Sequence, residues 1–365
     1  MRFGIFGSAQ AHSSDLGPET GQGFRDYIDY AVEAEALGFH SSFLVEHHFT
    51  GWNQVSATLT LQTALAMRTT ALRLGTGVIV LPWHNPVLLA EEAATLDLIS
   101  GGRLEFGIGK GYRHSEFKGF RIPPEEADAR FEESVEVLVR AWTTRERFSH
   151  RGRFWSFEDI VVEPPPMQQP HPPLWVAAGS EGSIRRAARR GFNLILDQYA
   201  SPQQLGERIA LYRDERLACG FGFDPMQVAV ARQLYVANDA ADAQAALARA
   251  AAHTQRTVEV ARTPDGRPSG SHVLSYADRA GATEAHALYA TPDAVCEGLQ
   301  ALHDAGVAYV LLTTLGGAAQ LRRFARDIMP SFADGVRPGE RAEAAAAPDR
   351  APAGVARQVR SLRVP

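Results

Sequence analysis

The sequence predicts an α/β fold in which eight parallel strands, each followed by a helix, close into a (β/α)₈ barrel. Eight short apolar runs alternate with longer stretches of helical periodicity over residues 1–332. This alternation is typical of parallel strands joined by helical crossovers, and an eight-stranded barrel leaves no strand edge unpaired. The alternative is a doubly wound open sheet, which usually carries GxGxxG after its first strand, where this chain reads GIFG at 4–7.

The expected strands are short runs of apolar and β-branched residues bounded by glycine, proline or polar clusters. The third expected strand contains Gly75 and Gly77, and glycine inside a strand usually marks a close approach to the backbone. Either a planar ligand at the barrel mouth or tight packing against neighbouring elements accounts for them. The eight strands are expected at residues 2–6, 41–45, 72–81, 103–108, 174–178, 193–198, 228–236 and 309–313.

The expected helices place apolar residues three and four positions apart and have recognisable ends. Gly38 follows the first helix as a C-cap, and Pro86 begins the third. Residues 148–173 break the pattern, and we expect a small hairpin and a proline-rich connection there. The helices are expected at residues 23–37, 54–69, 86–99, 124–145, 180–190, 202–219, 240–253, 292–305 and 318–332.

Composition excludes several classes of protein. Of 365 residues, 45% are hydrophobic and 22% charged, as in ordinary globular proteins, and the net charge of −5 leaves no broad basic field for nucleic acid. No window approaches 18 consecutive apolar residues, and the opening MRFGIFGSAQ indicates a strand and not a secretory signal. We therefore expect a cytoplasmic protein with no membrane or nucleic-acid partner. Cys219 and Cys296 lack metal-ligand spacing, and we expect both to be buried and unpaired.

The chemistry of such barrels lies at the C-terminal ends of the strands. Glu46, His47 and His48 follow the second strand directly. One interpretation is a surface histidine pair. A metal site is disfavoured because neighbouring side chains on a strand point in opposite directions, and we expect none. The third interpretation is one histidine turned into the barrel mouth as a hydrogen-bonding group or general base.

Two further strand ends carry residues suited to a phosphate. Gly109 and Lys110 follow the fourth strand in a glycine-rich loop, where exposed backbone amides and one cation suit an anion. Gly179, Ser180 and Ser183 follow the fifth strand and begin a helix, which is also a favourable place for an anion. The simpler interpretations are an ordinary glycine-rich strand end and an ordinary helix cap. Together the two segments predict a site for one phosphomonoester.

At this point the residues resemble the bacterial luciferase-like, flavin-dependent monooxygenase family, most closely the luciferase alpha subunit and its alkanal monooxygenase relatives. The matching segments are MRFGIF at the start, GFHSSFLVEHHFT at 38–50 and the stretch 72–112, with ATPDAVCEGLQALHDAG and FARDIMPSF near the end. The resemblance implies one TIM-like barrel over residues 1–332, with a lid after strand seven at 255–289. Residues 333–365 contain little apolar material and are expected to be a disordered tail.

The resemblance also implies an activity. Reduced FMN would come from a separate NAD(P)H flavin reductase, O₂ would add to it as a C4a-peroxyflavin, and a small or medium organic substrate would be oxidised. His47 matches the family's catalytic histidine, and Glu46 and His48 would orient it or line the pocket. The cofactor-binding positions implied are Gly77 and Val78 (a non-prolyl cis peptide under the flavin ring), Gly109, Lys110, Glu116, Gly179, Ser180 and Ser183.

Some positions depart from the family pattern. Lys110 stands where the family has arginine, so the grip on phosphate would lack a bidentate fork. LILDQYA at 194–200 replaces a tryptophan-containing strand, so Asp197 and Tyr199 either add polar groups to the pocket or pack. Two other functions stay open, an F420-dependent hydride-transferring oxidoreductase and a non-catalytic flavin-binding partner subunit. The EHHF segment argues against both. A homodimer through the apolar face of residues 88–98 is expected.

Overall fold

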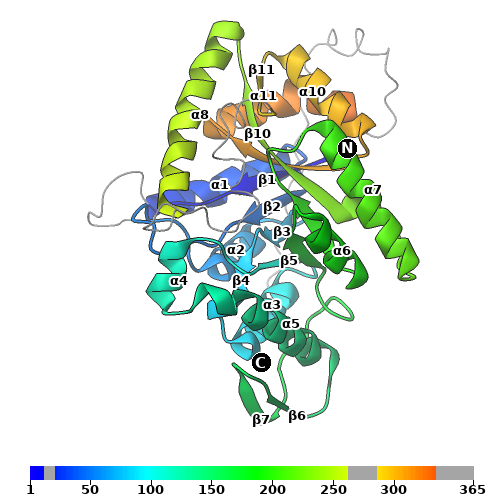
Figure 1. Ribbon diagram of the computed structural model, residues 1–365. Coiled ribbons are helices and arrows are strands. Elements are labelled where there is room, and N and C mark those ends of the chain that lie inside the picture. The colour runs from blue at the N-terminus through cyan, green and yellow to red at the C-terminus, as the bar shows by residue number, and fades with distance from the viewer. Residues whose placement is uncertain (12–20, 262–285, 334–365) are drawn as a thin grey trace, which may run out of the picture.

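Eight parallel strands close into a barrel in the computed structural model, which describes residues 1–11, 21–261 and 286–333 (Figure 1). Successive strands pair in chain order, and β10 pairs with both β9 and β12, which closes the sheet. The predicted barrel is confirmed and the open sheet is excluded. The barrel strands are β1 (Arg2–Gly7), β2 (Ser41–Leu44), β3 (Arg73–Thr76), β5 (Leu104–Gly109), β8 (Leu174–Ala177), β9 (Asn193–Leu196), β10 (Val228–Val236) and β12 (Tyr309–Thr314).

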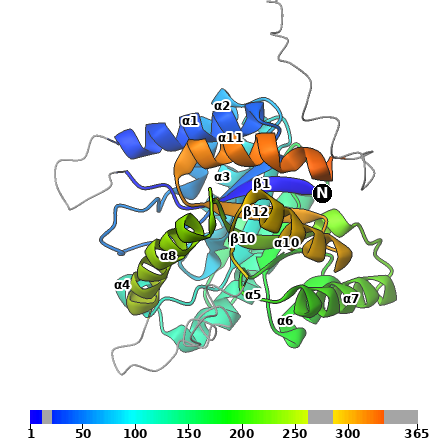
Figure 2. The ribbon, with the colours of Figure 1, turned by 90° about the horizontal axis from the view of Figure 1, so that it is seen from above.

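Helices cover the outside of the barrel. In Figure 2, α1 and α11 lie side by side, and they are in contact. The first and last parts of the fold also meet where the N-terminal amino group donates to the Phe332 carbonyl at 2.9 Å. The surrounding helices are α1 (Gln22–Ala36), α2 (Thr58–Arg68), α3 (Pro86–Ile99), α5 (Ala127–Thr143), α6 (Glu181–Arg189), α7 (Pro202–Ala218), α8 (Ala240–Ala261), α10 (Pro292–Asp304) and α11 (Gly317–Asp327), with short 3₁₀ turns at η1 (Leu81–Trp83), η2 (Pro124–Glu126), η3 (Pro225–Gln227) and η4 (Met329–Phe332).

The third predicted strand is divided in two. The chain forms β3 and then β4 (Ile79–Val80), and the peptide between Gly77 and Val78 is cis, as the resemblance implied. A Cβ on Gly75 would come within 2.4 Å of the Phe43 ring, and one on Gly77 within 2.7 Å of Phe6. Tight packing therefore accounts for both glycines without a ligand.

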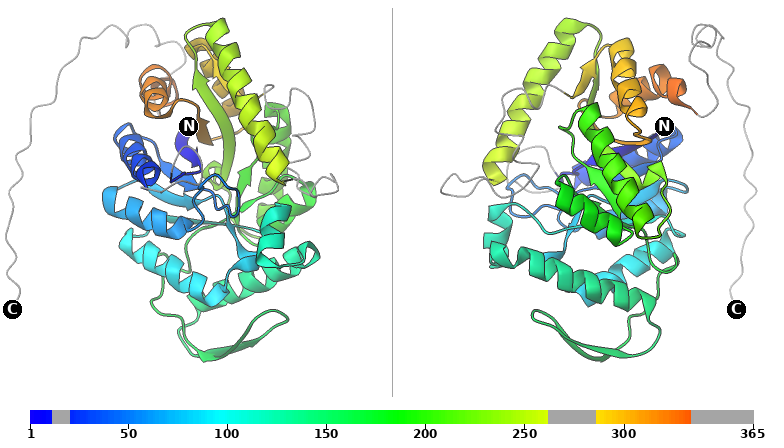
Figure 3. Two further views of the ribbon diagram at one scale, coloured as in Figure 1. Left: turned by 90° about the vertical axis from the view of Figure 1, so that its left-hand side faces the viewer. Right: turned by 45° about the vertical axis from the view of Figure 1, so that its right-hand side comes forward.

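One helix was not predicted and another is longer than predicted. Helix α4 (His114–Phe120) is a short helix after β5. Helix α8 continues to Ala261, past the predicted end at residue 253. The next element in the described part of the chain is strand β11 (Leu288–Ala290), which extends the sheet beside β10. Figure 3 shows α8 standing steeply against the barrel, and it contacts α4. The remainder of the predicted lid, residues 262–285, and the tail from residue 334 lie outside the described residues.

The core has two parts. Large apolar side chains fill the layer between strands and helices, and a smaller cluster that includes Phe43, Trp175 and Tyr309 packs together within the barrel. Polar groups lie beside that cluster and satisfy one another: Trp175 donates its Nε1–H to Glu105 at 2.6 Å, and Arg73 pairs with the same carboxylate. The barrel interior is therefore a packed core and not a channel.

The predicted insertion is present. Strands β6 (Phe148–Arg151) and β7 (Ser156–Ile160) form an antiparallel hairpin that projects at the end of the molecule farthest from α10 and α11 (Figure 1). The prediction for Cys219 is wrong, because this residue caps the end of α7 and is exposed, and Cys296 is only half-buried. Apolar spacing along α7 did not reveal that its last turn leaves the core.

Candidate active site

A histidine–glutamate pair lies at the barrel mouth. His47 follows β2, and its Nδ1 lies 3.1 Å from Oε1 of Glu116, which is in the first turn of α4. The same oxygen accepts the backbone N–H of His48 at 3.0 Å. The His47 side chain is 12% exposed and that of Glu116 is 2% exposed. The structure thus brings together two residues that are 69 positions apart in the sequence.

The charge state of His47 follows from its surroundings. Burial lowers the pKa of His47 below its ordinary value of 6.5, the contact with Glu116 raises it, and the charge of Arg113 lowers it, with a net decrease. The imidazole is therefore neutral near pH 7. A carboxylate accepts and does not donate, so Nδ1 carries the proton. Within the described part of the chain no group bonds to Nε2, which is left with a free lone pair.

Glu46 has its own set of hydrogen-bond partners. It accepts hydrogen bonds from Nε2 of His48 at 2.7 Å, Nε1 of Trp83 at 2.8 Å and the Val80 N–H at 3.1 Å. His84 Nε2 lies 2.9 Å from the same carboxylate. Although burial alone would raise it, these hydrogen bonds lower the pKa of Glu46 to about 2. Glu46 is therefore a buried anion that ties the β2 end to η1.

The resemblance implied that Glu46 and His48 either orient His47 or line the pocket, and in the described residues the first of these does not occur through hydrogen bonds. No hydrogen bond joins either side chain to the His47 imidazole there, and Glu116 holds it instead. The reason is the alternation of side chains along an extended segment, which turns His47 to the opposite side from its two neighbours. The pattern EHH could not show which carboxylate each imidazole meets, since the partner of His47 comes from α4.

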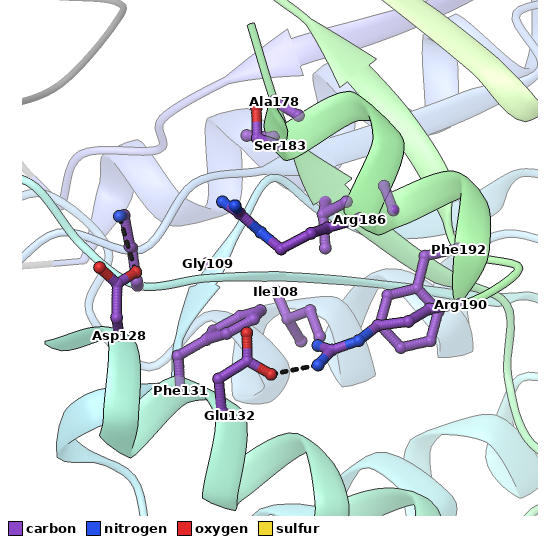
Figure 4. A pocket seen from close by; sticks show the side chains of 14 residues that line it. Ile108, Gly109, Asp128, Phe131, Glu132, Ala178, Ser183, Arg186, Arg190 and Phe192 are labelled. Carbon is purple, nitrogen blue, oxygen red and sulfur yellow. Dashed lines mark hydrogen bonds and ion pairs between the residues drawn. The ribbon is translucent and has the colours of Figure 1, made fainter. Parts of the chain in front are cut away.

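A pocket opens between the ends of β5 and β8 and the helices α5 and α6 (Figure 4). It lies beside the loop that leads to Glu116, because Gly109 and Lys110 line it. Its floor is apolar and its rim is charged. The residues lining it are Ile108, Gly109, Lys110, Asp128, Phe131, Glu132, Val176, Ala177, Ala178, Ser183, Arg186, Ala187, Arg190 and Phe192, which we call the anion pocket.

The cations of the anion pocket are not equivalent. Lys110 Nζ lies 2.8 Å from Asp128, and both side chains are more than half exposed. Arg190 pairs with Glu132. Arg186 extends from α6 into the middle of the pocket in Figure 4, and among the described residues no carboxylate pairs with it. The charge of Arg186 is therefore not compensated by a carboxylate of the described residues. The sequence does not single out Arg186, because α6 carries several arginines at similar spacing.

The serines behave as predicted for a helix start. Ser180 is the N-cap of α6, and its hydroxyl accepts the Ser183 N–H at 3.4 Å. Ser183 lines the pocket, and its hydroxyl donates to the Ser180 carbonyl at 2.8 Å. Gly179 precedes this cap. The hydrogen bonds of these serines within the protein are therefore those of an ordinary helix cap, as the simpler interpretation held. The Ser183 side chain also faces the pocket.

The end of β5 packs closely on β4. A Cβ on Gly109 would lie 2.5 Å from Cγ2 of Val78, so a side chain at this position would displace Val78. The pairing of Val80 with Gly109 fixes this contact. The cis peptide at Gly77 and Val78 and the anion pocket are thus adjacent parts of one strand-end surface.

The polar residues after β9 are used structurally. Asp197 pairs with Arg208 at 2.9 Å and accepts the N–H groups of Tyr199 and Ala200. Tyr199 is buried, and its hydroxyl accepts from Gln198 at 2.7 Å. These contacts favour the packing interpretation of Tyr199.

The described residues contain no group of three histidine, cysteine or acidic side chains placed to hold a metal ion. Nor does any helix within them have the length and apolar character that crossing a membrane requires.

The chain is similar in sequence to several known proteins. The oxygenase component of the flavin-dependent trigonelline monooxygenase from Acinetobacter baylyi is 31% identical over 250 residues, 67% of this chain and 68% of that protein. The F420-dependent glucose-6-phosphate dehydrogenase from Amycolatopsis mediterranei is 30% identical over 214 residues, 56% of this chain and 59% of that protein. The matches span 49%, 68% and 59% of the length of the first three curated relatives.

A solved structure is similar over most of the chain. The monooxygenase RslO1 from Streptomyces bottropensis superposes with a TM-score of 0.76 at 30% identity, covering 91% of this chain and all of that one. Residues 1–309 match the family described as luciferase-like monooxygenase. The chain therefore belongs to the luciferase-like monooxygenase family.

Proposed function

We propose that this protein is a monooxygenase that uses reduced FMN and O₂ to oxidise a small or medium organic substrate. The observation that carries the proposal is the pairing of neutral His47 with Glu116 at the same barrel mouth as the anion pocket. Relatives with flavin-dependent monooxygenase activity support it. The His47 pair provides a proton-handling group and the pocket provides a place for a phosphate.

The anion pocket fits the phosphate of a flavin mononucleotide. Arg186 supplies an uncompensated guanidinium, Ser183 a hydroxyl, and Lys110 a second cation beside Asp128. A guanidinium binds phosphate through two parallel hydrogen bonds, which compensates for lysine at position 110. The flavin ring would extend from there toward Gly109 and Val78. When bound, the reduced flavin supplies the electrons that activate O₂.

The chain's own contribution to the chemistry is the proton at His47. Glu116 fixes the Nδ1–H tautomer, so Nε2 can accept a proton or a hydrogen bond from a substrate oxygen. The His47 side chain is mostly buried, but Nε2 is not one of its fully buried atoms, so a substrate oxygen can reach it. Glu46 keeps the β2 end in place through its bonds to η1, and acts on the site only through that position.

An F420-dependent hydride transfer is the second candidate, because one relative is an F420-dependent dehydrogenase. A non-catalytic partner subunit is a weaker candidate, because a chain without catalysis has no need of the His47–Glu116 contact. Anaerobic titration of the protein with FMN, riboflavin and F420 separates these functions. We expect FMN to bind more tightly than riboflavin, which lacks the phosphate, and more tightly than F420. Preferential binding of F420 would favour the second candidate.

We further propose two protein partners. A separate NAD(P)H flavin reductase is supported by the description of one relative as an oxygenase component. A homodimer is supported by an exposed apolar stripe on α3 formed by Leu88, Leu98 and Ile99, beside the exposed Met67 of α2. Sedimentation velocity should show a dimer for the wild type and a monomer for Leu98→Glu; a monomer for both would contradict the dimer.

A further inference from the structure

A second cation at the barrel mouth, Arg113, forms no side-chain hydrogen bond or ion pair with the described residues. Arg113 ends the loop after β5 and is the N-cap of α4, and it is only 2% exposed. Its Nε and Nη1 atoms are fully buried and form no hydrogen bond. The guanidinium carbon lies 5.8 Å from the centre of the Tyr112 ring.

Other buried arginines in the described chain are satisfied. Arg232 is 1% exposed and donates to the carbonyls of Asp197, Ala231 and Ala200. Arg216 donates to the Gly222 carbonyl and the Tyr212 hydroxyl. The fold therefore provides acceptors for buried guanidinium groups elsewhere and provides none for Nε and Nη1 of Arg113.

An unpaired buried guanidinium is unfavourable because arginine keeps its charge at any ordinary pH. Buried polar atoms without partners are rare in native proteins and need an explanation such as a ligand. Arg113 lies close enough to His47 for its charge to lower the pKa of that imidazole. A ligand that reached Nε2 of His47 would thus lie within the electrostatic field of Arg113.

We propose that Arg113 binds a carboxylate on the substrate, so that this enzyme acts on organic acids. The proposal rests on the proposed function and names its substrate class. A guanidinium binds a carboxylate through two parallel hydrogen bonds along its Nε–Nη2 edge. Nε of Arg113 is unpaired, and among the described residues Nη2 forms no hydrogen bond either, so this edge is unused. The binding of the acid group would fix the orientation of the substrate while His47 meets the reacting part.

A flavoenzyme also binds the phosphate of its flavin, for which we proposed the anion pocket. The anion pocket lies between α5 and α6 and contains Arg186, whereas Arg113 begins α4 beside the His47–Glu116 pair. Arg113 does not line that pocket. The two unpaired arginines therefore define two anion sites at one barrel mouth.

The test uses matched neutral and anionic probes, benzoate against benzamide and hexanoate against hexanamide. Their binding to the full chain is measured by calorimetry, with and without FMN, for the wild type, Arg113→Met, Arg113→Lys and the crossed control Arg186→Met. We expect the wild type to prefer each acid to its amide. Arg113→Met should bind the acids about tenfold more weakly or worse and leave FMN binding unchanged. Arg113→Lys should be intermediate, and Arg186→Met should weaken FMN and leave the acids unaffected.

Three results would overturn the proposal. They are equal binding of acid and amide by the wild type, an Arg113→Met variant that binds the acids normally, and an Arg113→Met variant whose main loss is in FMN affinity. Thermal unfolding guards against misfolding, because Arg113→Met removes no protein hydrogen bond from Nε or Nη1 and should not lower the melting temperature. If FMN fails to bind while the preference for acids persists in the flavin-free protein, the proposed function fails and the acid site stands.

Discussion

His47 donates its Nδ1–H to the carboxylate of Glu116 across 3.1 Å, and this contact joins the end of β2 to the first turn of α4. It determines which nitrogen of the imidazole carries the proton and which is free. Since burial outweighs the effect of Glu116 on the pKa of His47, the pair holds a neutral base and not an ion pair near pH 7.

Glu116→Gln should move the pH dependence of activity. The amide cannot raise the pKa of His47 as the carboxylate does, so this pKa falls further below 6.5. Activity that needs neutral His47 is lost as the pH falls through the pKa, and the acid limb of the kcat/KM profile should move to lower pH. We also expect kcat to fall by about tenfold as the tautomer is no longer fixed. The control is the exposed Glu125→Gln, and an acid limb that stays in place in Glu116→Gln would contradict the contact's role.

Arg186→Met should weaken FMN binding without affecting riboflavin. The side chain faces the anion pocket with no carboxylate to neutralise it, so its loss removes a charge-assisted contact, and we expect the FMN dissociation constant to rise about tenfold or more. Lys110→Met should have a smaller effect, because Lys110 already pairs with Asp128 and is half exposed. Fluorescence quenching of the flavin measures both. If Lys110→Met proved the more damaging change, the ranking of the two cations would be wrong.

Glu46→Gln should lower stability near neutral pH more than it does in acid. The pKa of Glu46 is about 2 in the folded protein against an ordinary value of 4.5. A lowered pKa contributes stability that is present above pH 4.5 and is lost as the pH falls toward 2. The difference corresponds to about 3 kcal/mol at neutral pH. Denaturant unfolding at pH 3, 5 and 7 should therefore show a lower stability and a shallower pH dependence for Glu46→Gln. The exposed Glu136→Gln serves as the control and should match the wild type; a Glu46→Gln curve parallel to the wild-type curve would refute this account.

Gly107→Ala should destabilise the barrel. A Cβ at Gly107 would lie 1.8 Å from the Thr76 carbonyl oxygen, and backbone atoms cannot turn aside as a flexible side chain can. The Thr76 hydroxyl also donates to the Gly107 carbonyl at 2.7 Å and accepts its N–H at 2.8 Å, so β3 and β5 cannot separate without losing both bonds. We expect a loss of about 1–3 kcal/mol in the free energy of unfolding.

Gly222→Ala provides the matched control for this experiment. No atom lies within 4 Å of the position that its Cβ would occupy. Its melting temperature should stay close to that of the wild type, and equal losses in the two variants would show that steric contact with Thr76 is not the cause.

The strands could be predicted from the sequence because barrel strands are buried on both faces and form continuous apolar runs. Helix α4 could not, since HSEFKGF is short and includes a glycine, so no helical periodicity develops in it. The extension of α8 was missed because the polar residues after His253 hide its periodicity.

The site was predictable in part. The sequence could place His47, Ser183 and Lys110 at one mouth of the barrel because the C-terminal ends of the strands meet there. It could not identify the partner of His47, since side-chain contacts between segments 69 residues apart follow from packing and not from spacing. Arg113 and Arg186 were missed for a related reason. Only the structure shows which arginines lack a hydrogen-bond acceptor or a carboxylate partner.

The most direct test of the central claim is product analysis under ¹⁸O₂. Wild-type protein and His47→Ala are supplied with reduced FMN by an external reductase and given a panel of carboxylic acids, aldehydes, ketones and heteroatom compounds. The account predicts that the wild type places one ¹⁸O atom in a product, and that His47→Ala loses about 10²-fold or more of this activity while it binds FMN as the wild type does. Product that carries no ¹⁸O, or labelled product formed by His47→Ala at the wild-type rate, would contradict it.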